Sequence, residues 1–406
     1  MFCKKDRCRL CHSSDMYLIL KMPLLPPVDN FRKLDDKELT LPQFPMDLYI
    51  CKECKHVQLL DVVSPEILYG NYIYTSSSSP DLDRHFTLYA DRVVDRLQLK
   101  PPARILDVGS NDGLFLSKFK NKGFEVCGVD PSSYVASLAE KMGIPTEVGF
   151  FDHALVAKMQ KMDLVTANNV FSHADDLEGF ATAVHSVLSD AGVFVFEVSY
   201  LKDMIDNFVV DYIYHEHLCY HSVFPLKRFL ASCQLKLVHV ERVPTKGGSI
   251  RCYAVKSTNP VQPSPIVDQM IAEEMQSGLY DLDTYRDLEQ RITHLRESLR
   301  KLIKGHQIAA YGASATSTVL NALLGISESI SFIVDDNERR QSRFSPGHLI
   351  PVLSPQALID YRPSMTIISA WRFAEDIINK NQLYQQAGGR FIIPFPTLRQ
   401  AHARNC

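Results

Sequence analysis

A buried strand followed by a glycine turn and a short helix is the feature that most constrains this chain. Residues 104–108 form an apolar run bounded by Pro102 and Gly109, and residues 114–119 carry apolar side chains at helical spacing. Glycine at positions 109 and 113 lets the backbone turn tightly and approach a ligand closely. Because the free N–H groups of the first helical turn point at whatever lies above the strand, the sequence predicts a ligand site at this turn.

A second short strand, residues 125–130, ends in the carboxylate of Asp130. In a doubly wound sheet such an acid lies beside the first loop and can accept hydrogen bonds from both ribose hydroxyls of a nucleoside. A dinucleotide fingerprint does not fit, because Ser110 and Asn111 stand where the second glycine of G-x-G-x-x-G is expected. The segment Asp107–Gly113 resembles the Asp-x-Gly-x-x-x-Gly first motif of S-adenosylmethionine-dependent methyltransferases; a purely structural glycine turn or another nucleotide binder is the alternative.

Length and charge narrow the class of protein. A chain of 406 residues is too long for one compact core, so we expect two or three domains. The net charge of -3 and the lack of any Lys/Arg run argue against nucleic acid as a partner. No apolar run reaches the ~18 residues of a membrane span, and the first residues do not have the pattern of a signal peptide. We therefore expect a cytoplasmic protein that does not bind membranes.

Four of the ten cysteines form two Cys-x-x-Cys pairs, Cys8 with Cys11 and Cys51 with Cys54. Two such pairs present four thiolates at the spacing of a closed, tetrahedral zinc site, which leaves no position for a substrate. The sequence thus predicts structural zinc, with ordinary reduced thiols as the alternative. A cluster of tyrosine and serine follows at residues 69–80. Its composition favours a solvated linker, but it could equally supply hydroxyl groups to a polar substrate.

From Ala103 onward, predicted strands alternate with helices, which argues for a mostly parallel sheet with helices on both faces. Ligands of such sheets bind beyond the carboxyl ends of the strands. One crevice there is expected to collect Gly109, Asp130, Phe150, Phe151, Asp152, Asn168, Asn169 and Glu197. Phe150 or Phe151 could stack on an adenine, although both could equally be core aromatics.

The densest group of titratable residues lies at 211–221, where His215 and His217 flank Glu216. A metal site is one interpretation, but the spacing is not His-Glu-x-x-His, and histidines two apart point in different directions on a helix. An acid–base cluster is another, because a histidine adjusted by a carboxylate and phenols suits removal of a carbon-bound proton. A satisfied structural cluster is the third.

Arg251 follows a glycine pair and could clamp a phosphate or carboxylate, although an exposed strand arginine is commoner. The composition of the chain changes near Asn259 and Pro260. Residues 263–305 are typical of one or two long charged helices. Residues 307–315 and 330–337 repeat the pattern of strand, glycine and helix followed by a strand with terminal acids. A second nucleotide-type α/β domain is therefore expected.

Taken together, the ordered motifs resemble the nucleotide-sugar C-methyltransferases of deoxysugar biosynthesis. The motifs are Cys-x-x-Cys twice, Tyr-x-Tyr-x-Ser, Asp-Val-Gly-Ser-Asn-Asp-Gly, Tyr-x-Glu-His, Gly-Gly-Ser-x-Arg, Tyr-Gly-Ala and Val-Asp-Asp. The resemblance implies an α/β fold with a Rossmann-like class I methyltransferase core, a small N-terminal zinc-binding domain and a C-terminal Rossmann-like α/β domain. We expect the boundaries 1–80, 81–262 and 263–406, the last part including the helical arm.

The resemblance also implies the chemistry. Such enzymes methylate the carbon next to the ketone of a keto-deoxysugar carried on a nucleoside diphosphate, so S-adenosylmethionine, structural Zn²⁺ and a nucleotide-sugar are the expected cofactors and substrate, and we expect a monomer. His217 is expected to remove the proton alpha to the ketone, and the enolate then attacks the sulfonium methyl. An O- or N-methyltransferase, or an inactive binding homologue, is the alternative.

The expected site residues fall into four groups. The catalytic group is His217, Glu216 and Tyr214, assisted by Tyr74 and His173. The methyl donor is expected to be held by Asp107, Gly109, Asn111, Gly113, Asp130, Asn168 and Phe151. The acceptor is expected to contact Ser76, Tyr200, Tyr220 and Arg251, and zinc to be bound by Cys8, Cys11, Cys51 and Cys54.

Four positions depart from the pattern of the resembled family. His215 stands where some members have an acid, and Lys246 where histidine often precedes the glycine pair. Thr316 replaces a lysine after Gly-Ala-x-Ala, and Arg372 follows Trp371 where asparagine is common. The last two lie in the C-terminal domain, which is expected to help hold the nucleotide-sugar, so these departures leave the identity of the acceptor open.

Overall fold

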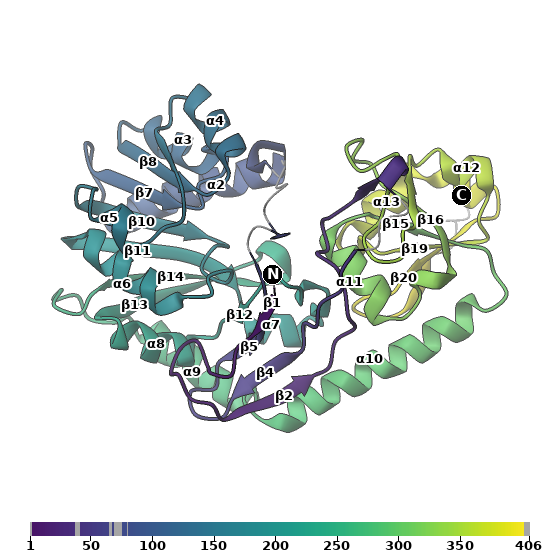
Figure 1. Ribbon diagram of the computed structural model, residues 1–406, viewed down its shortest axis with the longest axis horizontal. Helices are drawn as coiled ribbons and strands as arrows, with labels where there is room; N and C mark the ends of the chain where they lie inside the picture. The colour runs from purple at the N-terminus through teal and green to yellow at the C-terminus, as the bar shows by residue number, and fades with distance from the viewer. Residues whose placement is uncertain (1, 37–40, 65–66, 69–74, 79, 402–406) are drawn as a thin grey trace.

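The computed structural model describes residues 2–36, 41–64, 67–68, 75–78 and 80–401 (Figure 1). Two α/β units stand side by side, and the first strands of the chain lie between them, above the long helix α10 (Leu282–Ile303). Among the described residues, no helix is both long enough and apolar enough to cross a membrane.

The first unit is built on a seven-stranded sheet in the order β13-β14-β11-β10-β7-β8-β9. Only β14 runs against the other strands, since it pairs antiparallel with both β11 and β13. The sheet thus has the mostly parallel character expected from the alternation of strands and helices. Its strands are β7 (Arg104–Val108), β8 (Glu125–Asp130), β9 (Thr146–Val148), β10 (Met162–Asn168), β11 (Leu188–Ser199), β13 (Leu235–Val243) and β14 (Ser249–Lys256).

Alternating apolar side chains cover both faces of this sheet. Leu164 and Val195 face a cluster with the aromatic side chains of α2 and α3, whereas their neighbours Val165 and Phe194 face α6 and α8. Successive strand residues point to opposite faces, so near-continuous apolar runs are what a sheet buried on both sides requires. The helices of this unit are α2 (Pro80–Leu97), α3 (Leu114–Lys120), α4 (Ser133–Lys141), α5 (His153–Val156), α6 (Leu177–Val187), α7 (Leu201–Asp206) and α8 (Val223–Ser232).

The N-terminal strands are tied to both units. The four-stranded sheet β12-β5-β4-β2 takes its edge strand β12 (Cys219–Tyr220) from the first unit, and β3 (Arg32–Lys33) joins the sheet of the second. Hydrogen-bonded sheets therefore cross the expected boundaries at residues 80 and 262. The other N-terminal strands are β1 (Phe2–Lys4), β2 (Met16–Leu20), β4 (Leu48–Cys51), β5 (Val57–Leu59) and β6 (Asp61–Val63), with β1 and β6 paired antiparallel.

The second unit repeats the pattern of strand, glycine turn and helix, and its eight-stranded sheet has the order β21-β20-β19-β15-β16-β18-β17-β3. Its strands are β15 (Ile308–Tyr311), β16 (Ile330–Val334), β17 (Arg343–Phe344), β18 (Pro351–Leu353), β19 (Met365–Ile368), β20 (Arg390–Ile393) and β21 (Arg399–Ala401). Its helices are α11 (Ala315–Leu323), α12 (Ala357–Tyr361), α13 (Ala374–Lys380) and α14 (Gln382–Gln386). The charged region 263–305, for which the sequence predicts one or two long helices, forms two, α9 (Pro265–Gln276) and α10.

A single apolar cluster joins the parts of the molecule. It runs from the N-terminal strands through α7 and the following segment to α10, α11 and the second sheet. Helix α10 contributes Tyr285, Leu288, Ile292, Leu295 and Leu299, the spacing of a one-faced amphipathic helix. The segment 207–221, which carries the predicted catalytic residues Tyr214, Glu216 and His217, is therefore held between the two units.

Candidate active site

The glycine turn after β7 has the backbone that the sequence predicts. Gly109 and Gly113 have φ angles of 70° and 78°, a region that other residues rarely adopt. A Cβ atom on Gly109 would lie 2.3 Å from Cγ2 of Val170, in the loop after β10. The turn and that loop thus approach so closely at the carboxyl edge of the sheet that only glycine fits.

Asp130 holds this turn in place from the end of β8. Its Oδ2 accepts a hydrogen bond from the N–H of Asn111 at 3.0 Å, and its Oδ1 accepts one from the N–H of Ser132 at 2.9 Å. Burial raises the pKa of Asp130, and these two hydrogen bonds partly oppose the effect. The buried carboxylate at the strand end has the position expected of a ribose ligand.

Asp107, at the end of β7, connects the turn to β10. Its Oδ1 accepts hydrogen bonds from Thr166 Oγ1 at 2.6 Å and from Asn168 Nδ2 at 3.3 Å. Burial is the main cause that raises the pKa of Asp107 to about 7. The Oδ1 atom of Asn168 is buried, and no described residue donates to it, so an acceptor for a ligand donor remains at the strand end.

The described part of the tyrosine–serine cluster is not a solvated linker. Ser76 is buried, and its N–H donates to Asn111 Oδ1 at 2.9 Å, while the N–H of Ser77 donates to Asp112 Oδ2 at 2.9 Å. The linker interpretation is wrong for Ser76 and Ser77, because their N–H groups donate to side chains of the glycine turn. Ser76 therefore lies over the donor turn. Tyr74 lies outside the described residues.

Phe151 and Phe150 lie beyond β9 in different surroundings. The half-buried Phe151 ring packs against Phe180, with 5.0 Å between ring centroids, whereas Phe150 is exposed. An adenine contact at Phe151 stays a prediction.

His217 lies in a stack of rings contributed by two loops. Its ring centroid is 4.1 Å from that of Tyr214, 5.1 Å from that of His173 and 5.7 Å from that of Tyr212. His173 belongs to the loop that also carries Val170, so one short loop runs from the glycine turn to the predicted base. The structure brings His173, Tyr214 and His217 together as the sequence predicts.

The hydrogen bond of His217 fixes its protonation geometry. Nδ1 lies 2.8 Å from the carbonyl oxygen of Tyr212, and a carbonyl can only accept, so Nδ1 carries the hydrogen and Nε2 keeps its lone pair. Burial is the main cause that lowers the pKa of His217 to about 3; the hydrogen bond to Tyr212 opposes this shift, and the positive charge of Lys246 adds to it. The imidazole is thus neutral at physiological pH.

The neighbours of His217 in sequence have different roles. Burial raises the pKa of Glu216 to about 7, with Asp29 adding to the effect and Lys246 opposing it. His215 turns away from this group: its Nε2 lies 3.2 Å from the carbonyl oxygen of Phe44, and its ring packs edge-on against the Phe44 ring. Residues 215 and 217 therefore do not converge on one point.

A small pocket opens beside His217. Tyr212, Tyr220, Lys246 and the pair Gly247 and Gly248 contribute to its walls. The Tyr220 hydroxyl lies 3.4 Å from the Tyr212 carbonyl oxygen, which therefore receives two donors. Lys246 places a cation at the edge of the pocket, where a developing negative charge or an anionic group would be stabilised.

Two expected acceptor contacts lie elsewhere. The Arg251 guanidinium is buried, with Nη2 2.9 Å from Glu197 Oε2 and Cζ 3.5 Å from the centroid of the Tyr89 ring. The hydroxyl of buried Tyr200 donates to Glu274 Oε1 at 3.0 Å, and Glu274 also accepts from the N–H groups that begin α8. Both side chains are engaged by protein carboxylates, and their contacts with substrate stay predictions.

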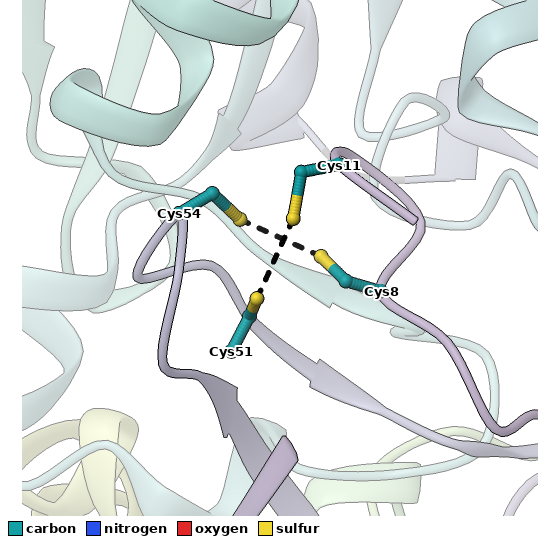
Figure 2. Close-up of side chains that lie close together, drawn as sticks. All are labelled: Cys8, Cys11, Cys51 and Cys54. Carbon is teal, nitrogen blue, oxygen red and sulfur yellow. Dashed lines mark hydrogen bonds between the residues drawn. The ribbon is translucent and has the colours of Figure 1, made fainter. Parts of the chain in front are cut away.

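The four cysteines converge at one point (Figure 2). Their sulfur atoms all lie within 4.8 Å of one another, with Cys8 to Cys54 and Cys11 to Cys51 both at 3.5 Å. Four thiolates about 2.3 Å from a tetrahedral Zn²⁺ have comparable mutual separations. Gln58 Nε2 donates to Cys8 Sγ at 3.1 Å, the kind of outer contact that orients a metal ligand. The donor set fits a closed zinc site, which holds the strands of the N-terminal region together.

A class I methyltransferase is the class of protein that this sheet and donor turn define. Three family models match the chain: a zinc binding domain over residues 8–69, a methyltransferase domain over residues 82–240, and the C-methyltransferase C-terminal domain over residues 244–396. The chain is 30% identical over 413 residues to the C-methyltransferase NovU of Streptomyces niveus, and the match covers 98% of each chain.

This chain belongs to the C-methyltransferase family that contains NovU, and it is an S-adenosylmethionine-dependent, zinc-binding enzyme. Among solved structures, the PH0226 protein of Pyrococcus horikoshii is 16% identical over 46% of this chain and 97% of its own, with a TM-score of 0.38. The magnesium protoporphyrin IX methyltransferase of Synechocystis is 14% identical over 46% of this chain and 90% of its own, with a TM-score of 0.36. Similarity at this level carries no information about the substrate.

Sequence reasoning missed three contributions to the site. The carbonyl of Tyr212 orients His217, Lys246 borders the pocket, and Asp211, which precedes Tyr212, is bound by residues of the second unit. A backbone carbonyl leaves no mark in a sequence, and the partners of Asp211 lie far along the chain. Lys246 had a visible signal, since it departs from the pattern of the resembled family.

Proposed function

We propose that this enzyme methylates the carbon next to the ketone of a keto-deoxysugar carried on a nucleoside diphosphate. The resemblance of the ordered motifs supports this acceptor class, and the membership in a C-methyltransferase family is consistent with it. The observation that carries the proposal is His217, a neutral buried histidine with its free Nε2 beside a pocket. Carbon is a poor nucleophile until it is deprotonated, so a C-methyltransferase of this type needs such a base.

In this proposal, His217 Nε2 takes the proton alpha to the ketone, and the carbon–hydrogen electron pair moves into the enolate. The imidazolium formed in a buried site needs a nearby negative charge, which the enolate oxygen provides. Lys246 borders the same pocket, and its charge stabilises that oxygen. Bound S-adenosylmethionine supplies an electrophilic methyl group, and Asp130, Asp107 and the glycine turn hold it at the sheet edge.

The remaining expected residues complete the proposal. Tyr214 and His173 pack against the base and keep its ring in position, and Glu216 exchanges protons close to neutral pH. Tyr220 donates to the same carbonyl that orients His217. The second α/β unit contributes to binding of the nucleotide-sugar.

Product analysis tests the acceptor class. The enzyme would be incubated with methyl-¹³C S-adenosylmethionine and a panel of nucleoside-diphosphate keto-deoxysugars, and the products examined by carbon NMR. The proposal requires coupling between the labelled methyl carbon and a ring carbon, because only C-methylation forms a carbon–carbon bond. A label on oxygen or nitrogen, or no product from any panel member while the donor binds, would contradict it.

A further inference from the structure

Residues of the second α/β unit bind a buried carboxylate that directly precedes Tyr212 of the pocket wall. Asp211 lies in a short 3₁₀ turn, Val210–Tyr212, and its carboxylate is fully buried. Arg372 binds it with both terminal nitrogens, Nη1 to Oδ2 and Nη2 to Oδ1, each at 2.9 Å. Trp371 Nε1 donates to Oδ2 at 2.9 Å. All three donors come from one turn of the second unit, Trp371–Phe373.

We propose that the C-terminal unit positions His217 through the ion pair of Arg372 with Asp211. We call these two residues the clasp. Arg372 is a positioning residue in this scheme, since its contacts are with Asp211 and with rings, and its influence reaches the base through Tyr212. The inference rests on the proposed role of His217 for its catalytic meaning.

Two routes of contact lead from Arg372 to His217. The first is the backbone: Asp211 is followed directly by Tyr212, whose carbonyl oxygen accepts from His217 Nδ1 at 2.8 Å. The second is a stack of planar groups: the Arg372 guanidinium lies 4.7 Å from the centroid of the Tyr212 ring, which in turn stacks on the His217 ring at 16°. Both routes converge on Tyr212, so its position depends on the clasp.

The chemistry of the clasp suits a positioning role. A planar guanidinium that binds a carboxylate through two parallel hydrogen bonds fixes orientation as well as distance, which a lysine cannot do. Because Asp211 is fully buried, loss of Arg372 would leave its charge with Trp371 as the remaining side-chain donor among the residues that the structure describes. A buried charge left in this way is expected to move toward water, and the turn that carries Tyr212 would move with it.

Arg372 also supports a wall of the pocket. A Cβ atom on Gly247 would lie 3.7 Å from Arg372 Nε, so the arginine packs against the glycine pair that borders the pocket. The departure at position 372 from the asparagine common in the resembled family therefore has a structural consequence. An asparagine is too short to reach Asp211 with two donors and to cover the Tyr212 ring as well.

The test is a measurement on His217 itself, in the full-length protein without substrate. Histidine labelled with ¹⁵N in the ring would be incorporated, and the His217 signals assigned by their loss in His217→Asn. In the wild type, two-bond ¹H–¹⁵N spectra are expected to show a single tautomer with the hydrogen on Nδ1. In Arg372→Gln, we expect a second population with the hydrogen on Nε2, and Arg372→Lys is expected to restore the wild-type spectrum incompletely.

Arg399→Gln is the matched control, because Arg399 forms an exposed ion pair with Glu375 in the same unit. It is expected to leave the His217 signals unchanged. Asp211→Asn, which keeps the shape of the side chain, is the second variant and is expected to act like Arg372→Gln, and the other histidine signals report whether each variant is folded. Wild-type His217 signals in either folded clasp variant would overturn the proposal. Since no substrate is present, that failure is distinct from normal turnover in His217→Asn, which would instead refute the proposed base.

Discussion

The Nδ1 atom of His217 lies 2.8 Å from the carbonyl oxygen of Tyr212, and this contact sets which ring nitrogen is free to take a proton. The same carbonyl oxygen also accepts a hydrogen bond from the Tyr220 hydroxyl. Tyr212 directly follows Asp211, whose carboxylate is bound by Arg372 of the second α/β unit. The base is therefore oriented by the backbone of a turn that lies between two units of the molecule.

Replacement of His217 by Asn is expected to lower turnover by about 10²–10⁴-fold, the usual contribution of a general base. The affinity for S-adenosylmethionine should stay as in the wild type, because the donor turn has its own supports at Asp107 and Asp130. Steady-state kinetics and calorimetry measure the two quantities. Normal turnover in this variant would remove His217 as the base.

Asp130→Ala is expected to weaken binding of the methyl donor by about ten- to a hundred-fold, the effect of losing hydrogen bonds to a charged group. The second unit offers a matched control in Asp335, which accepts from the N–H groups of Ala313 at 2.6 Å and Asn337 at 2.7 Å in the same way. Asp335→Ala should leave donor affinity unchanged in calorimetry. Equal loss in both variants would mean that the donor is not held by Asp130 in particular.

Cys51→Ser is expected to lose the zinc ion and to lower the unfolding temperature, because a site with three thiolates and a hydroxyl binds Zn²⁺ more weakly. Cys3→Ser serves as the control, since Cys3 is an exposed thiol on β1, outside the four-cysteine cluster. Elemental analysis should find zinc in the wild type and the control. Full metal content in Cys51→Ser would refute the four-thiolate site.

Glu216 predicts a pH dependence of stability with a defined sign. Its pKa in the folded protein is raised to about 7, above the value of about 4.3 expected in an unfolded chain. The folded state therefore holds the proton more tightly, and the stability this contributes is present below the unfolded pKa and is lost as the pH rises through 7. The side chain at this position is neutral at every pH in Glu216→Gln, so the stability of this variant does not fall in this way.

The measurement is the difference in unfolding temperature between Glu216→Gln and the wild type, which should grow in favour of the variant from pH 5 to pH 8. Asp107, whose pKa is also raised to about 7, titrates in both proteins and cancels in the difference. A difference that stays constant over this range would show that Glu216 does not titrate there.

Local sequence patterns predicted the parts of the fold that depend on local order. Strand β7 has the predicted bounds, and Gly109 and Gly113 adopt the backbone for which glycine was required. The strand periodicity and the turn residues are properties of a few consecutive residues, so no distant contact is needed to recognise them. The two cysteine pairs are equally local, and their convergence follows from the metal chemistry.

The features that the sequence did not predict depend on contacts between distant segments. The pairing of β12 with β5 brings Cys219 opposite Gln58, although most of the first unit lies between them in the sequence. Strand β12 has two residues, which are too few to show the alternation typical of a strand. Arg251 is a residue type that often binds anions, but its guanidinium donates to the carboxylate of Glu197 on the neighbouring strand. The bond between Asp211 and Arg372 likewise joins positions whose local sequences carry no signal of each other.

Hydrogen exchange at the acceptor carbon tests the central claim most directly. The wild type and His217→Asn would be incubated in deuterated water with S-adenosylmethionine and a panel of nucleoside-diphosphate keto-deoxysugars, and the sugars analysed by mass spectrometry. We expect the wild type to place deuterium or a methyl group on at least one panel member, and His217→Asn to do neither. If the donor binds but no sugar gains mass, or if the variant matches the wild type, base-assisted C-methylation of a nucleotide-sugar would be contradicted.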